Sequence, residues 1–88
     1  MTKKELVRET AHSTGMTLKD TELALNGIIK IITDTLTAGD TVVLRGFGEF
    51  RCTQTSSEGV RYPSFSAGLT LRNSVAGPPE DIQEDDED

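Results

Sequence analysis

The stretch VVLRGFGEF, residues 42–50, decides the fold of this 88-residue chain. It opens with the two-residue repeat of a β-strand, in which Val42 and Leu44 fall on the same side. The Gly-Phe-Gly triplet at 46–48 predicts a turn with an aromatic residue at its tip. Because the alternation resumes over residues 49–55, the stretch predicts a β-hairpin.

The residues after this hairpin predict one more strand and a short helix. A second tight turn is expected at 56–59, followed by a strand over 60–63 that Pro63 ends or places at a sheet edge. Ser66 is expected to cap a last helix, which is interrupted by the weak helix former Gly68. The apolar positions of this helix are Leu69, Leu71 and Val75.

Two helices are predicted before the hairpin. Residues 2–5, TKKE, fit a capping box, and the helix that starts there is expected to end near Gly15. A second box at 17–20 opens a helix over 18–37, which ends at the Ala-Gly-Asp of 38–40. The order helix, helix, three strands, helix predicts an α+β fold. One apolar stripe follows the second helix and consists of Leu18, Leu25, Ile28, Ile29, Ile32 and Leu36.

The composition gives a single copy of the chain little to bury. Hydrophobic residues make up 34% of it, with no Trp, one Tyr and three Phe. A core this thin hardly offsets the entropy cost of folding so small a domain. We therefore expect an obligate oligomer.

The composition also excludes several classes of protein. The single cysteine, Cys52, cannot form an internal disulfide. Because His12 is the only other Cys or His residue of the chain, the two cannot build a structural zinc site either. Since no nucleophile, phosphate loop or metal cluster is recognisable, we expect no catalytic residue, no metal, no cofactor and no enzyme activity. No apolar run is long enough for a membrane span, and the first residues lack the apolar run of a signal peptide, so we expect a cytoplasmic protein.

The net charge of −6 is concentrated at one end of the chain. Residues 1–76 contain all nine basic side chains and eight acidic ones, whereas residues 77–88 contain seven acidic side chains and no basic one. Such a composition is typical of a disordered acidic extension. We therefore expect a near-neutral domain at 1–76 and an acidic tail at 77–88.

Several of these elements together resemble one family. The turn at Gly15, the long helix that ends at 38–40, the stretch 42–50 and PSFSAG at 63–68 resemble the HU and integration-host-factor family of bacterial DNA-bending proteins. The resemblance covers residues 1–76, and Gly-Phe-Gly-x-Phe is its most specific part. It implies an intertwined dimer with a base of helices, a saddle of strands, and a β-ribbon arm from each subunit around the DNA minor groove. The partner chain would be a second copy, or another HU-family protein in a heterodimer.

The resemblance also assigns the aromatic residues. All three phenylalanines stand where the family forms its aromatic dimer core, in agreement with the oligomer expected from composition. The expected dimer core consists of Leu25, Ile29, Ile32, Leu44, Phe47, Phe50 and Phe65.

The sequence departs from the family in its arm. Only 14 residues lie between Phe50 and Phe65, too few for a full ribbon arm, and no Arg-Asn-Pro tip occurs. Threonines at 53 and 55 replace arginines of the family, and Ser66 and Leu69 replace lysines. Without the proline wedge the family's bending mechanism is not transferred. Any DNA binding must therefore use the body of the dimer.

Phosphate recognition needs cations on one face of the protein. Gly46 and Gly48 could add backbone amides that approach phosphates closely. In the alternative interpretation, Arg45 and Arg51 belong to an ordinary solvated sheet face and pair with Glu49. The predicted DNA-binding residues are Lys3, Arg45, Gly46, Gly48, Arg51, Arg61 and Arg72.

The sequence therefore predicts a non-catalytic, histone-like DNA-binding protein of the nucleoid with weak sequence selectivity. The alternative is a dimer of the same fold that has lost DNA affinity and acts as a protein-interaction or DNA-mimicking module through its acidic tail. The tail itself either keeps the dimer soluble or competes with DNA phosphates for the arginines of the body.

Overall fold

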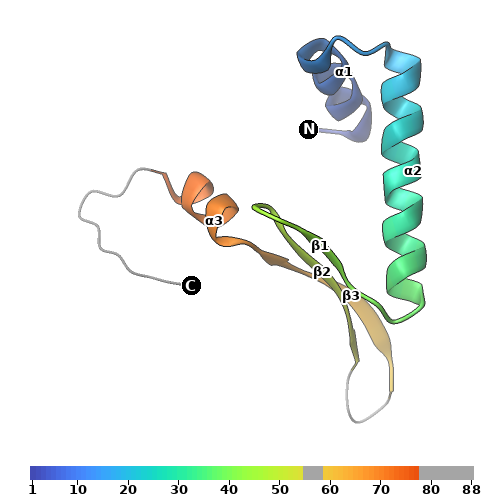
Figure 1. Cartoon of the computed structure of the whole chain (residues 1–88), viewed down its shortest axis with the longest axis vertical. Helices are drawn as coiled ribbons and strands as arrows, with labels where there is room; N and C mark the ends of the chain where they lie inside the picture. Colours follow the sequence, from blue (N-terminus) through green and yellow to red (C-terminus); the bar gives the residue numbers. More distant parts are fainter. Residues whose placement is uncertain (55–58, 78–88) are drawn as a thin grey trace. The chain divides into compact units, whose positions relative to one another are not determined.

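The computed structural model describes residues 1–54 and 59–77. Its order of elements confirms the predicted α+β fold (Figure 1). The chain divides into two compact units, residues 1–34 and 35–88. The elements are α1 (Lys3–Thr14), α2 (Leu18–Thr37), β1 (Val42–Leu44), β2 (Gly48–Gln54), β3 (Arg61–Ala67) and α3 (Leu69–Ala76).

Helix α1 has the ends that the sequence predicts. The Thr2 hydroxyl accepts a hydrogen bond from the Glu5 amide at 3.2 Å, and the Glu5 carboxylate accepts one from the Thr2 amide at 2.8 Å. This reciprocal pair is the predicted capping box. Gly15 ends the helix in the left-handed region, at φ +79°. The helix buries Val7 and Ala11.

Helix α2 runs over the predicted residues, 18–37. At its start the Thr17 hydroxyl accepts from the Asp20 amide at 3.0 Å, which satisfies one of the free amides of the first turn. At its end the amide of Gly39 (φ +86°) donates to the Leu36 carbonyl, and the amide of Asp40 to the Thr35 carbonyl. These two bonds form a Schellman motif, which explains why the helix stops at the predicted glycine.

One ion pair on α2 lies on its solvent side. Lys30 Nζ is 2.7 Å from Asp34 Oδ2, one helical turn away. The hydrogen bond to Asp34 and the charge of that carboxylate raise the pKa of Lys30. Lys30 is thus engaged with a partner on its own helix.

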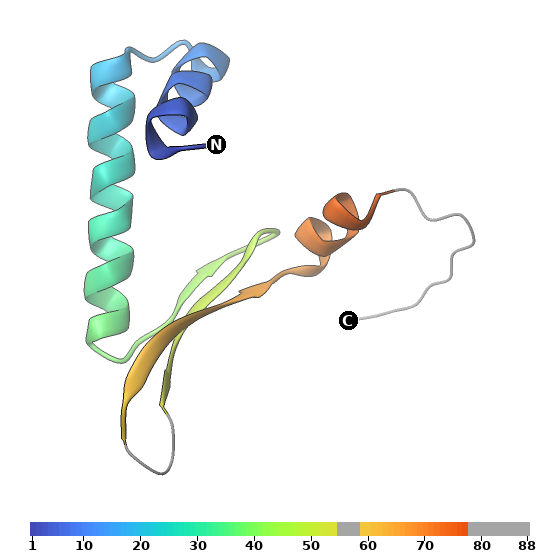
Figure 2. The same ribbon diagram turned by 180° about the vertical axis from the view of Figure 1, so that it is seen from behind.

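The three strands form one antiparallel sheet in the order β1-β2-β3 (Figure 2). The turn between β1 and β2 is closed by a 2.8 Å hydrogen bond from the Phe47 amide to the Leu44 carbonyl. Gly46 occupies its third position with φ +85°, which a side chain would disfavour. The predicted hairpin is therefore confirmed, but the central residues of its turn are Arg45 and Gly46, so Phe47 is not at the tip as predicted. The predicted turn at 56–59 lies almost wholly outside the described residues.

The third strand is longer than predicted. It was expected over 60–63 with Pro63 as its end, but β3 continues to Ala67. Pro63 stands opposite Cys52 within the ladder. Because β3 is an edge strand of the described sheet, the missing proline N–H interrupts no central ladder, and the strand passes through it.

The prediction for the start of the last helix is also wrong. Ser66 belongs to β3 and does not cap α3; Gly68 is the N-cap residue, so it precedes the helix and does not interrupt it. The Gly68 amide donates to the Phe47 carbonyl at 2.8 Å, while its carbonyl accepts from Arg72. Gly68 thus ties the end of β3 to the hairpin turn and starts α3.

A single chain buries few of its apolar side chains. Among the described residues, the buried hydrophobic side chains are Val7 and Ala11 alone. The stripe of α2 is open, with Ile28 54% exposed and Ile29 45% exposed. In the described part of the chain, no helix combines the length and the apolar character needed to cross a membrane.

Candidate nucleic-acid interface

The register of the strands divides the sheet into two different faces. Phe50 stands opposite Phe65, and Gln54 opposite Arg61, so these four residues share one face, here called the phenylalanine face. The other face, here called the hydroxyl face, carries the alternate residues. They are Val43, Glu49, Arg51, Thr53, Tyr62, Ser64 and Ser66.

The phenylalanine face holds a cluster of three rings. The ring centroid of Phe65 is 4.8 Å from that of Phe50 and 5.4 Å from that of Phe47, both in tilted geometry. Phe47 is nevertheless 45% exposed and Phe65 44% exposed. The cluster is therefore formed within one chain but covered on one side only.

Gly48 belongs to this cluster and not to an open phosphate-binding turn. A Cβ on Gly48 would lie 2.5 Å from the Phe65 ring and 2.6 Å from the Ser66 carbonyl oxygen. The residue is buried. That Gly48 offers its amide to a phosphate stays a prediction, and its burial beside the Phe65 ring speaks against it.

The hydroxyl face is polar and carries little net charge. The hydroxyl oxygens of Thr53 and Ser64 are 2.8 Å apart and share a hydrogen bond across the strands. Arg51 Nε lies 3.4 Å from Glu49 Oε2, two residues away on β2. This ion pair is the alternative considered for Arg51, and it means that phosphate competes with Glu49 for the guanidinium. Hydroxyl groups themselves are common ligands of DNA phosphates.

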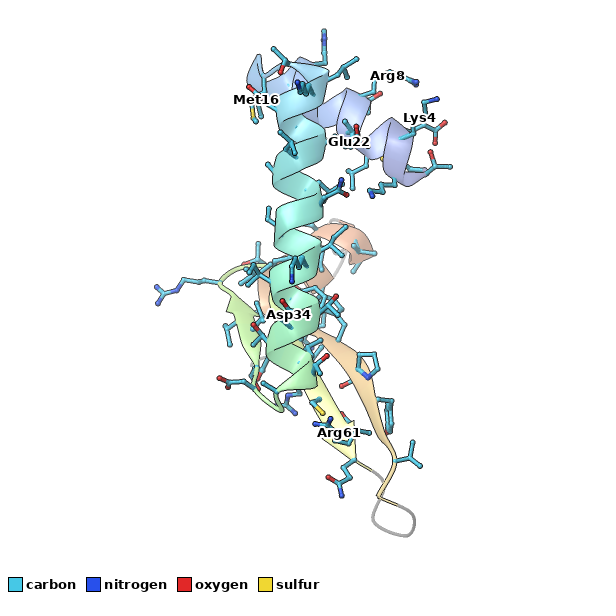
Figure 3. All side chains as sticks on the ribbon, turned by 90° about the vertical axis from the view of Figure 1, so that its right-hand side faces the viewer. Lys4, Arg8, Met16, Glu22, Asp34 and Arg61 are labelled. Atoms are coloured by element: carbon cyan, nitrogen blue, oxygen red, sulfur yellow. The ribbon has the colours of Figure 1, made fainter. Side chains whose placement is uncertain are left out.

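Arg61 lies on the phenylalanine face, away from Arg51. Its Nη1 atom is 3.9 Å from the Sγ atom of Cys52, the half-buried thiol on the same face, as the alternation with Phe50 predicts. Figure 3 labels Arg61 beside the strands. A single flat contact with the sheet can therefore include Arg51 or Arg61 but not both.

The remaining predicted residues lie outside the strands. Arg45 and Gly46 are exposed in the turn between β1 and β2, and Arg45 forms no ion pair with any described residue. Arg72 is exposed on α3. Lys3 is exposed in the first turn of α1, in the other unit. The structure thus brings Arg45 and Gly46 together in one turn.

The hydroxyl-bearing residues were missed as a group by the sequence analysis. Thr53 and Ser66 were noted only as replacements of basic residues, and Ser64 was not singled out. The spacing Ser64, Ser66 on a strand is a signal for one face, but it requires the correct bounds of β3. With the strand ended at Pro63, neither serine belonged to the sheet.

Comparisons with known proteins identify the family. Residues 1–70 match the family described as bacterial DNA-binding protein. DNA-binding protein HU of Lactococcus lactis is 32% identical over an alignment that covers 83% of this chain and 96% of that protein. DNA-binding protein HU-1 of Halalkalibacterium halodurans is 34% identical, with 85% of this chain and 99% of that protein covered.

Solved structures agree with the sequence relatives. A mutant of HU from Thermotoga maritima superposes with a TM-score of 0.78 at 33% identity, covering 85% of this chain and 99% of that one. A cocrystal of Anabaena HU with DNA gives a TM-score of 0.75 at 32% identity, covering 89% and 100%. The chain therefore belongs to the HU family of bacterial DNA-binding proteins. The resemblance inferred from residues 42–50 and 63–68 is confirmed.

Proposed function

We propose that this protein is a non-catalytic, histone-like protein that binds double-stranded DNA as a homodimer in the bacterial nucleoid. The observation that carries the proposal is the two-sided sheet of an HU-family chain. One face offers hydroxyl groups and Arg51, and the opposite face offers a half-open aromatic cluster. A polar face fits phosphates, and an apolar face fits a partner chain.

The exposed apolar side chains support the dimer. Phe47 in the turn before β2, Phe65 on β3 and Ile29 on α2 are each between 44% and 45% exposed in one chain. Full burial of such a side chain is worth about 1.5–3 kcal/mol, of which a single chain forgoes roughly half. The predicted dimer core also contains Leu25, Ile32, Leu44 and Phe50. A heterodimer with another HU-family protein would use the same surface.

The mode of DNA contact follows from the available side chains. Arg45, the Gly46 amide, Arg51 and the hydroxyls of Thr53 and Ser64 are groups that contact phosphate oxygens. Phosphate contacts carry no base information, so the proposed binding is weakly sequence selective. Lys3 and Arg72 remain proposed contacts outside the sheet, whereas Arg61 would have to reach DNA around the edge of the sheet.

A shortened ribbon arm is part of the proposal. The connection from Gln54 to Arg61 leaves six residues between β2 and β3. The alignment with HU-1 of Halalkalibacterium halodurans is 89 residues long and takes in 99% of that protein but 85% of this chain. The relative therefore has positions without a counterpart here, in agreement with a shortened arm. Contacts by the body replace those of an arm in this proposal.

The acidic segment is treated as a separate part of the chain. We assign DNA binding and dimerisation to residues 1–76. Residues 77–88 are set apart because they contain seven acidic side chains and no basic one. Apart from Gly77, this segment lies outside the described residues. The proposed location is the cytoplasm, where the nucleoid lies.

A salt titration tests the proposal. Full-length protein is titrated onto a fluorescein-labelled duplex at several salt concentrations, and anisotropy gives the dissociation constant at each one. Phosphate binding predicts that the logarithm of the binding constant falls linearly with the logarithm of the salt concentration. The slope becomes steeper by about 0.9 for each phosphate contacted. No binding even at low salt would contradict the proposal and favour the protein-interaction module.

A further inference from the structure

Helix α1 carries a row of basic side chains that the sheet-based site does not use. Lys4, Arg8 and His12 follow one another at intervals of four residues, the spacing that places side chains on one side of a helix. All three are exposed. Figure 3 shows Lys4 and Arg8 extending outward from the helix.

The row lies apart from the packed side of its helix. The buried residues of α1 are Val7 and Ala11, and Val7 lines the apolar cavity between α1 and α2. The lining of that cavity includes Leu6 of α1 and Leu25 and Ile28 of α2, and none of the three basic residues. Packing within the unit therefore gives no reason for basic side chains at these positions.

Acidic neighbours on α1 do not neutralise the row. The Glu5 carboxylate accepts the Thr2 amide at 2.8 Å in the capping box. Glu9 stands next to Arg8 in the chain, yet no ion pair joins it to a described residue. The ion pairs that join two described residues, Lys30 with Asp34 and Arg51 with Glu49, include no residue of α1.

The sheet gives a reason to look for further cations. On the hydroxyl face Arg51 is paired with Glu49, and Arg61 lies on the opposite face. Affinity for duplex DNA at physiological salt depends on the number of phosphates that cations neutralise. The hydroxyl face alone offers few of them, whereas residues 3–8 contain three of the nine Lys and Arg side chains of the chain.

We propose that the row Lys4, Arg8, His12 binds the phosphate backbone of duplex DNA as a second contact surface, distinct from the sheet. The proposal rests on the function proposed above. At a rise of 1.5 Å per residue the row extends over about 12 Å of helix. One strand of duplex DNA has a phosphate about every 3.4 Å along its axis, so the row can meet more than one phosphate.

A pair of double variants of the full-length chain tests this surface. K4Q/R8Q removes two charges from the row, and K19Q/K30Q removes two charges from α2, where Lys30 is paired with Asp34. The two variants have the same net charge. We expect K4Q/R8Q to weaken binding to a labelled duplex about tenfold at moderate salt and to lower the salt slope by about two per chain. The K19Q/K30Q control should stay within about twofold of the parent.

A charge-conserving variant separates charge from structure. K4R/R8K keeps both cations and should bind like the parent, and circular dichroism should show the same helix content in every variant. Equal losses in K4Q/R8Q and K19Q/K30Q would mean a general charge effect and would overturn the proposal, as would no loss in either.

Three further outcomes identify what failed. Tighter binding by K4Q/R8Q would overturn the proposal in favour of the chain's own acidic residues 80–88 as the occupant of the row. If the parent itself does not bind the duplex, the proposed function fails, and the proposed DNA contact of the row fails with it. A parent that binds, with a K4Q/R8Q variant that binds equally well, refutes the row alone.

Discussion

At the scale of single residues, Gly48 has a packing role that a substitution can measure. In Gly48→Ala the new methyl group would lie 2.5 Å from the Phe65 ring and 2.6 Å from a backbone carbonyl, so ring and strand must shift. We expect a loss of about 1–3 kcal/mol in the free energy of unfolding. The measurement is chemical denaturation followed by circular dichroism.

Gly27 provides the matched control for that substitution. It lies within α2, and an added Cβ meets no described atom within 4 Å. Gly27→Ala should therefore stabilise the protein by about 0.5–1 kcal/mol through helix propensity. Destabilisation by Gly27→Ala to the same degree as by Gly48→Ala would contradict the packing argument, since both glycines would then be required for another reason.

Glu49 is expected to weaken DNA binding through its ion pair with Arg51. The two groups are 3.4 Å apart, and the Arg51 side chain is 55% exposed. Glu49→Gln should release the guanidinium for phosphate and tighten binding about twofold to fivefold, the range of an exposed ion pair. Anisotropy on a short duplex at low salt measures the change.

Asp34→Asn is the control for Glu49→Gln. It removes one negative charge from an ion pair on α2, so the net charge changes equally. If both variants bind DNA more tightly to the same degree, the gain is a matter of total charge and the role given to Glu49 is wrong.

At the scale of elements, the two sides of β3 should respond differently to substitution. Phe65 is 44% exposed and Tyr62 is 45% exposed in one chain, yet they lie on opposite faces of the same strand. If a partner chain covers the phenylalanine face, Phe65→Ala should cost about 3–5 kcal/mol of stability and shift the dimer towards monomer. Tyr62→Ala should change stability by less than about 1 kcal/mol.

Size-exclusion chromatography over a range of protein concentrations, together with denaturation, compares the two variants. Equal effects of Phe65→Ala and Tyr62→Ala would contradict the assignment of faces, because nothing else in their exposure distinguishes them.

The first two helices and the hairpin could be predicted because their signals are local. The capping box at Thr2, the glycines at 15 and 39, and the Gly-Phe-Gly turn each act within a few residues. The bounds of β3 could not be predicted in this way. Pairing with β2 continues the strand beyond Pro63, and this pairing joins residues that are far apart in the sequence.

The division of the sheet into faces depends on that same register. Arg51 and Arg61 were predicted as members of one DNA-binding set. Whether they lie on the same face of the sheet depends on the strand register, which pairs Gln54 with Arg61 and places them on opposite faces. A shift of one residue would exchange the faces of β3. The sequence therefore supplied the candidate cations without showing which of them share a surface.

At the scale of the whole molecule, the acidic segment should compete with DNA. Residues 77–88 carry seven negative charges on the same chain as a near-neutral body, so their effective concentration near the arginines is high. Deletion of residues 77–88 should tighten DNA binding, most strongly at low salt where screening is weakest. Anisotropy with full-length and 1–76 protein side by side measures this, and identical affinities would mean that the segment is inert.

In the proposed dimer two chains share one core, and sedimentation at micromolar concentration tests that core most directly. We predict a particle with the mass of two chains, whose melting temperature rises with protein concentration because dissociation accompanies unfolding. A compact, stably folded single chain of 9.5 kDa would contradict the account, because its phenylalanine cluster would then need no partner.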